Sequence, residues 1–455
     1  MSCGYENHEM EFEMPRVQKA FARLGITGED IARGKQRLVT YYDMELKGVR
    51  KILGLFLKEL VNITLAKEEG KNRIIHGCMA PTFEVFGSAL VSYSNDVCVM
   101  VPNPLFMVVF GCILGKFVPI LEAAERHWLK GGLVSHCAMV KTRVGLLALN
   151  LIPKPDLMIT SGSLCETSPK TNDLFHELYD IPTFYHDTCQ DRELRDYPDS
   201  TQAMALSAKG MRRMVQRLQE VVGFEITDDM LWEVIRIKDE IAEGIDRVRE
   251  LVRNSDPVPM RSTHENLLAW FTPVPLSMDY LLATKNAVDI LYEELKERVD
   301  KGEGPIEKGA PKLMAICPNH HSDPRLEHLV NESGMALIAT DMEFSAPFIS
   351  SEAPKDPCEA LSQYINASLA VYLGGRLSII LDACKRLKVD GVLNHYHVGC
   401  RSVAGDALIL KDVIQKELGI PVLTLEWENF DPRVYDHEQY KTRLEVFRSM
   451  IGNGN

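Results

Sequence analysis

The chain has 455 residues, which is enough for two or three domains that each bury a core of their own. An apolar fraction of 45% and a charged fraction of 25% are ordinary for a globular protein and exclude a disordered or fibrous chain. The formal net charge of −13 argues against a nucleic-acid-binding surface and favours solubility.

The N-terminal part, residues 1–70, is expected to be a helical region. The first residues contain neither a basic segment nor an apolar run, so we expect no signal peptide and a cytoplasmic protein. Apolar residues then recur at helical spacing. The predicted helices are Ala20–Leu24, Ile31–Leu38 and the longer Tyr41–Lys67.

The most apolar stretch of the chain is Val97–Ile120. Its uninterrupted part, Leu105–Leu114, is too short to cross a bilayer. We therefore expect this stretch to be buried core, and we expect no membrane interaction.

Residues 71–200 are predicted to form a first α/β domain, because strand-like and helix-like patterns alternate there. Phe83–Tyr93 is compatible with either a helix or a strand. The remaining predicted elements are strands at Arg73–Ile75, Asp156–Ser161 and Thr183–Tyr185, and helices at Ala138–Leu149 and Asn172–Tyr179.

Residues 201–305 are predicted to be helical. Gly223 would end a helix at Gly210–Val222, and Thr227 would cap a long helix at Met230–Val252. A further helix is predicted at Met278–Val299. The turn-rich linker that follows it marks a domain boundary.

Residues 306–455 again alternate between strand and helix, which predicts a second α/β domain with a parallel sheet. The whole chain is thus expected to contain two doubly wound, flavodoxin- or Rossmann-like domains, with a helical N-terminal arm and a helical middle segment. The predicted strands are Lys312–Cys317, Ala336–Thr340, Gly391–Asn394 and Pro421–Glu426, and the predicted helices are Asp323–Glu332, Asn366–Leu387 and Ala404–Leu418.

Three cysteines, Cys137, Cys165 and Cys400, each precede a predicted helix, and the last two also follow a short apolar strand and a polar turn. Open α/β sheets bind ligands at this edge, and a helix N-terminus stabilises a thiolate. The three could bind an iron–sulfur cluster or could be small residues in tight turns, and spacing alone leaves both possibilities open. Five other cysteines are expected to be buried apolar residues: Cys3, Cys98, Cys112, Cys358 and Cys384.

Three histidines flank these cysteines, namely His136, His395 and His397. They are candidate proton donors, because histidine titrates near neutral pH, or else surface residues of turns. Asn319–His321 is a candidate binding loop. Glu426–Arg433 is expected to be a water-exposed acidic strand end, where Arg433 and Arg443 could equally steady the loop by pairing with acidic side chains. The chain has no Walker A sequence, so it is not expected to bind ATP itself.

Five segments together give the chain a resemblance to a known family. It resembles the 2-hydroxyacyl-CoA dehydratase and benzoyl-CoA reductase family, and is most similar to the B-type subunit of the ATP-dependent benzoyl-CoA reductases. The order and placement of the segments are more specific than any one of them. The segments are Ser135–Gly145, Ser163–Cys165, Arg298–Ile306, Val398–Gly405 and Asp431–Glu445.

The resemblance implies that Cys137, Cys165 and Cys400 hold a [4Fe–4S] cluster in a cleft between the α/β domains, with one iron left without a protein sulfur. It also implies a CoA thioester substrate, a homologous partner subunit with its own cluster, and a separate ATP-hydrolysing iron–sulfur activator. The implied chemistry is an oxygen-sensitive one-electron reduction of the thioester.

Three other interpretations remain open. One is a homodimeric reductase of small molecules with a double-cubane cluster. Another is a non-catalytic electron-transfer or maturation subunit whose cluster has a fourth protein ligand, for which Cys78 and Cys189 are candidates. The third is a metal-free α/β protein that binds CoA in a structural role. The sequence does not distinguish dehydration from reduction of an aromatic ring.

Overall fold

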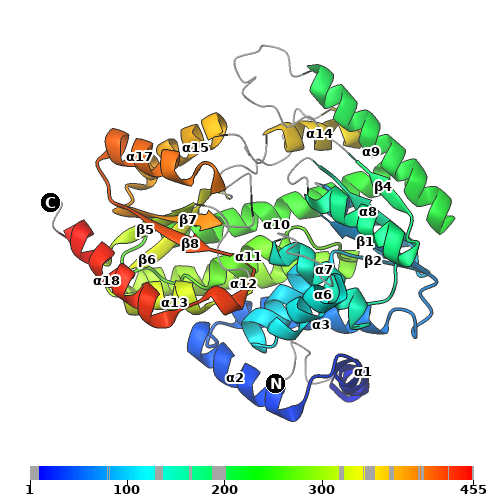
Figure 1. The fold of residues 1–455 in the computed structure, drawn as a ribbon, viewed down its shortest axis with the longest axis horizontal. Coiled ribbons are helices and arrows are strands. Elements are labelled where there is room, and N and C mark those ends of the chain that lie inside the picture. The colour runs from blue at the N-terminus through cyan, green and yellow to red at the C-terminus, as the bar shows by residue number, and fades with distance from the viewer. Residues whose placement is uncertain are drawn as a thin grey trace.

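The structure of the chain is a computed structural model (Figure 1). It describes residues 10–78, 80, 82–128, 137–162, 167–186, 201–316, 322–341, 343, 354–367, 373–397, 400, 404–428 and 430–452.

Two four-stranded parallel sheets have the same topology, with strand orders β2-β1-β3-β4 and β6-β5-β7-β8. This confirms the predicted pair of doubly wound α/β units. The strands are β1 (Arg73–Cys78), β2 (Val97–Met100), β3 (Leu157–Thr160), β4 (Thr183–Tyr185), β5 (Lys312–Ile316), β6 (Ala336–Thr340), β7 (Gly391–His397) and β8 (Val422–Trp427).

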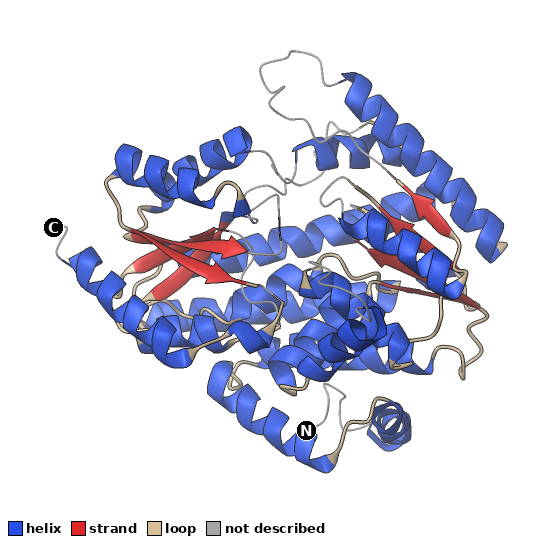
Figure 2. Cartoon of the chain, in the orientation of Figure 1, coloured by secondary structure: helices blue, strands red, loops and turns tan. Residues whose placement is uncertain are grey.

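Helices surround and separate the sheets (Figure 2). In the first half they are α1 (Met10–Arg23), α2 (Gly28–Tyr41), α3 (Lys47–Leu65), α4 (Phe83–Tyr93), α5 (Pro102–Phe106), the π-helix η1 (Met107–Ile113), α6 (Val118–Trp128), α7 (Ala138–Ala148), α8 (Thr167–Tyr179) and α9 (Thr201–Val222). In the second half they are α10 (Asp228–Asn254), α11 (His264–Phe271), α12 (Met278–Lys301), α13 (Arg325–Glu332), α14 (Pro357–Ala367), α15 (Leu373–Leu387), α17 (Ala407–Leu418), the 3₁₀ helix η4 (Pro432–Val434) and α18 (His437–Gly452).

Most of the predicted elements are present, but the helix predicted at Tyr41–Lys67 is wrong at its start, because Tyr41 ends α2 and α3 begins at Lys47. The ambiguous segment Phe83–Tyr93 is the helix α4. The predicted helix Asn366–Leu387 is described in part, as the end of α14 and as α15, and residues 368–372 lie outside the described residues. β7 is longer than predicted and continues through His397. The helices α5, η1, α6, α11, η4 and α18 were not predicted, and neither was most of α14.

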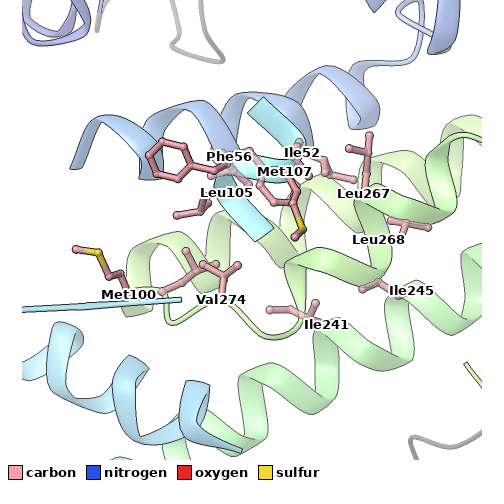
Figure 3. Close-up of a cluster of buried hydrophobic side chains, with 14 of the residues drawn as sticks. Ile52, Phe56, Met100, Leu105, Met107, Ile241, Ile245, Leu267, Leu268 and Val274 are labelled. Carbon is pink, nitrogen blue, oxygen red and sulfur yellow. The ribbon is translucent and has the colours of Figure 1, made fainter. Parts of the chain in front are cut away.

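A single buried apolar cluster connects the two sheets through the central helices α3, α10, α11 and α12. Figure 3 shows part of it, where Phe56 of α3, Met107 of η1 and Ile241 of α10 lie around one centre. The apolar stretch that begins at Val97 is buried here in β2, α5 and η1, as predicted. No helix in the described part of the chain is both long and apolar enough to cross a membrane.

Local sequence signals set the ends of the central helices. The side chain of Thr227 accepts a hydrogen bond from the N–H of Met230 and caps α10, as expected for this residue type. Gly302 ends α12 in the left-handed conformation with φ of 67°. The domain boundaries at residues 70, 200 and 305 remain predictions.

A close contact between α6 and α7 fixes the helix that begins after Cys137. A Cβ atom on Gly145 would lie 1.9 Å from the carbonyl oxygen of Ile120, so only glycine fits there.

The strand arrowheads of the β5–β8 sheet point toward the side of the molecule that contains the other sheet (Figure 2).

Candidate functional site

The carboxyl ends of the strands are the place where both units can present side chains to a ligand. In each sheet the first and third strands of the unit are neighbours, β1 beside β3 and β5 beside β7. The strand order reverses there, which is the usual binding position of an open parallel sheet. Cys165 follows β3 and Cys400 follows β7 in the sequence, so the two occupy equivalent places in their units.

Cys137 is the N-cap residue of α7. Its backbone is extended, with φ of −63° and ψ of 156°, and its side chain makes no capping hydrogen bond. The thiol is half-buried. The first N–H groups of a helix and the helix dipole both favour a thiolate at this place.

Cys400 stands three positions after the end of β7. Its N–H donates to the carbonyl oxygen of His397 at 3.1 Å, and its own carbonyl oxygen accepts from the N–H of Ala404 at 2.8 Å. Like Cys137, its side chain is half-buried.

Exposure separates these two cysteines from the other described ones. Cys137 and Cys400 are the only described cysteines that are not buried, and no described cysteine is in a disulfide. Burial raises the pKa of the Cys98 thiol, and raises that of Cys112, Cys358 and Cys384 to about 12, so these four resist ionisation. The prediction that Cys98, Cys112, Cys358 and Cys384 are buried apolar residues is confirmed.

Several predicted site residues lie outside the described residues, namely Cys165, His136, Asn319, His320, His321, Cys3 and Cys189. The described residues accordingly contain no group of three or more His, Cys, Asp or Glu side chains arranged to hold a metal ion.

Glu428, at the end of β8, connects the two cysteine-bearing segments. Its Oε1 accepts a 3.1 Å hydrogen bond from the N–H of Ala138, the residue after Cys137. Its Oε2 lies 3.8 Å from Nδ1 of His397, whose carbonyl oxygen accepts from Cys400. The first α/β unit thus meets the second at the two cysteines.

The expectation that this strand end is exposed to water is wrong for Glu428. The side chain of Glu428 is only 16% exposed, because the N-terminus of α7 covers it. This burial raises the pKa of Glu428 to about 7. A single sequence gave no sign of this, because Ala138 lies 290 positions away.

His395 and His397 both belong to β7 and are buried, with 1% and 2% exposure. The interpretation of these histidines as surface residues of a turn is therefore excluded. The ring of His397 packs edge-on against Phe430, with centroids 5.9 Å apart.

Ion pairs brace the junction from outside. Arg433 pairs with Asp431 and with Glu125 of α6, and Glu125 also pairs with Lys141 of α7. The hydrogen bonds from Arg433 lower the pKa of Glu125 to about 2. The expected pairing of Arg433 with acidic side chains is confirmed, and it ties α6 and α7 to the loop after β8.

Cys78 lies at the end of β1, beside the start of α8. Its Sγ and its carbonyl oxygen each lie 3.3 Å from Oγ of Ser168, which also lies 2.8 Å from Oγ1 of Thr160. Ser168 stands three positions after Cys165 in the sequence. Cys78 is thus next to the helix that follows Cys165, although its side chain is only 4% exposed.

These residues fit an iron–sulfur cluster in two respects. The half-exposed thiols of Cys137 and Cys400 lie at helical turns on opposite sides of one junction, where thiolate ligands and N–H donors to cluster sulfides are available together.

Comparison with known proteins gives consistent matches. A family model described as "2-hydroxyglutaryl-CoA dehydratase, D-component" matches residues 98–451, which include Cys137, Cys165 and Cys400. The B-type subunit of benzoyl-CoA reductase from Thauera aromatica is 22% identical over 357 residues, which cover 69% of this chain and 76% of that protein. The alpha subunit of lactoyl-CoA dehydratase from Anaerotignum propionicum is 24% identical over 315 residues, 66% of this chain and 70% of that protein.

Proposed function

Since the chain belongs to the 2-hydroxyglutaryl-CoA dehydratase D-component family, we propose that it is the iron–sulfur subunit of an acyl-CoA reductase or dehydratase. The proposed substrate is a CoA thioester, which accepts one electron. The proposed cluster ligands are Cys137, Cys165 and Cys400.

One observation supports this proposal above the others. The hydrogen bond from Ala138 to Glu428 and the contact from Glu428 to His397 bring the segments of Cys137 and Cys400 to the same junction. These are also the two described cysteines whose thiols are not buried. A structural role in tight turns would require neither their exposure nor this meeting.

A [4Fe–4S] cluster, when bound, would supply an electron of low potential to the thioester. The chain's own residues would hold the cofactor at the helix N-termini and limit the access of water. His397 is the better placed of the candidate proton donors, because its Nδ1 lies 3.8 Å from a carboxylate that can hold a proton. His395 and His136 remain candidates.

The relatives are named as single subunits of a reductase and of a dehydratase, which supports a multi-subunit enzyme. We propose a homologous partner subunit with a cluster of its own and a separate ATP-hydrolysing iron–sulfur activator. We also propose a cytoplasmic location, where thiols stay reduced.

The test is to add CoA thioesters to the anaerobically purified chain and record its visible and electron paramagnetic resonance spectra. We expect a spectral change with benzoyl-CoA or with a 2-hydroxyacyl-CoA, and none with free CoA. Turnover with the partner and the activator then identifies the reaction. A cluster that responds to neither thioester would contradict the proposal.

The position of Cys78 beside Ser168 supports a second candidate, a fully ligated cluster in an electron-transfer subunit. In that case Cys78→Ser would change the spectrum of the cluster and acyl-CoA would not. Eight irons per chain, rather than four, would instead favour the double-cubane reductase.

A further inference from the structure

A buried cation without a carboxylate partner among the described residues lies on α7. Arg143 is only 4% exposed, and its Nη2 donates a hydrogen bond to Oδ1 of Asn172 at 2.5 Å. Its guanidinium also lies over the ring of Phe175, 5.1 Å from the centroid. Within the described part of the chain, its Nη1 has no hydrogen-bond partner, and neither has Nδ2 of Asn172.

Burial of an unpaired guanidinium is unfavourable, and a negative charge nearby would offset that cost. No carboxylate of the described residues pairs with Arg143, whereas the other deeply buried arginines, Arg253 and Arg376, pair with Glu343 and Asp341. Burial lowers the pKa of Arg143, and the neighbouring Cys78 opposes this shift. Arginine nevertheless stays protonated in proteins.

The position of Arg143 in the chain indicates which negative charge could compensate its own. Arg143 lies six residues after Cys137 on α7, and Asn172 lies seven residues after Cys165 on α8. Their hydrogen bond therefore joins the two helices that follow two of the proposed cluster ligands. Two buried N–H donors, on Arg143 and Asn172, have no partner among the described residues and belong to the same polar cluster.

We propose that Arg143 is the buried counter-charge of the anionic cluster held by Cys137, Cys165 and Cys400, with Asn172 as the residue that positions its guanidinium. The inference rests on the proposed function. A cluster with three thiolate ligands has a net negative charge, and net charge is one of the factors that set its reduction potential. A fixed positive charge nearby eases the addition of an electron.

Asn172→Asp tests this directly, because it places a carboxylate on the guanidinium with almost no change in volume. Arg143→Met removes the charge, and Arg143→Lys restores it. Lys170→Met is the matched control, since it removes one positive charge from an exposed side chain of α8. Each anaerobic protein is titrated for its midpoint potential and analysed for iron and sulfide, and its folding is followed by thermal melting.

We expect Asn172→Asp and Arg143→Met to shift the potential to more negative values, and Arg143→Lys and Lys170→Met to leave it near that of the wild type. If Arg143 only ties α7 to α8, Arg143→Met lowers the melting temperature while Asn172→Asp leaves the potential unmoved, and the inference is overturned. A higher potential in Cys78→Ser, with no effect of Asn172→Asp, would assign the compensating charge to that thiol and also overturn it. A wild-type chain without iron would overturn the proposed function itself.

Discussion

The carboxylate of Glu428 and the backbone N–H of Ala138 are joined by a 3.1 Å hydrogen bond across 290 positions of sequence. Glu428 thereby caps, from the second α/β unit, the helix that begins after Cys137 in the first. The same carboxylate lies 3.8 Å from Nδ1 of His397, which stands three positions before Cys400. Glu428 thus contributes to the relative position of the two cysteine-bearing segments.

Glu428→Ala should therefore destabilise the junction. We expect a loss of about 1 kcal/mol in the free energy of unfolding, typical of a lost capping hydrogen bond, together with reduced iron content. Denaturant unfolding and iron analysis under anaerobic conditions measure both quantities.

Glu428→Gln is the matched control, because it keeps an acceptor oxygen. The pKa of Glu428 is raised in the folded state, so its stabilising contribution falls as pH rises from about 4.5 to about 7. Over this pH range, the free energy of unfolding of Glu428→Gln should rise relative to that of the wild type. Equal stability and iron content in the wild type and Glu428→Ala would contradict the role of this bond.

Gly145→Ala should disturb the packing of α6 against α7. The new methyl group would meet the carbonyl oxygen of Ile120, and we expect a loss of about 1–3 kcal/mol, as for other overpacked sites. Gly28→Ala is the control, since a Cβ there meets nothing within 4 Å. Thermal or denaturant unfolding of the two variants measures the difference, and an equally small effect of both would show that α7 has room to move.

His76 should make the chain sensitive to acid. Burial and the charge of Arg143 lower the pKa of His76 to about 3, so the unfolded chain takes up a proton between about pH 6.5 and 3 that the native chain does not. Stability is therefore lost as pH falls through this range, by up to about 1.4 kcal/mol per pH unit from this residue.

The comparison of His76→Gln with wild type isolates that effect, and His437→Gln is the control on an exposed histidine. Urea unfolding between pH 7 and 5 should give a shallower pH dependence for His76→Gln alone. Parallel curves for the wild type and both variants would show that His76 is protonated in the native chain.

The strands were predictable because short apolar runs between turn residues are specific to buried parallel sheets. The extension of β7 through His397 was not, because histidines in a buried strand require partners from other elements. One such partner is Phe430, which lies 33 positions later. From the amino-acid sequence alone, polar residues of this kind predict a turn.

The break between α2 and α3 was missed for a related reason, since the helical pattern continues through Tyr41–Lys67 and packing decides where a helix begins. In the candidate site, Cys165 and Cys400 were picked out by their places after strands, and Cys137 by its place before a helix. The roles of Glu428 and Asn172 depend on contacts between distant segments. Arg143 did leave a signal in the sequence, as a charged residue within the apolar helix α7.

The central claim is that three cysteines distant in sequence share one cluster. The most direct measurement is iron and acid-labile sulfide per chain in anaerobically purified wild type, Cys137→Ala, Cys165→Ala and Cys400→Ala, with the buried Cys384→Ala as control. We predict about four of each in the wild type and the control, and loss of the cluster in each ligand variant. Full cluster content in Cys400→Ala would contradict the account.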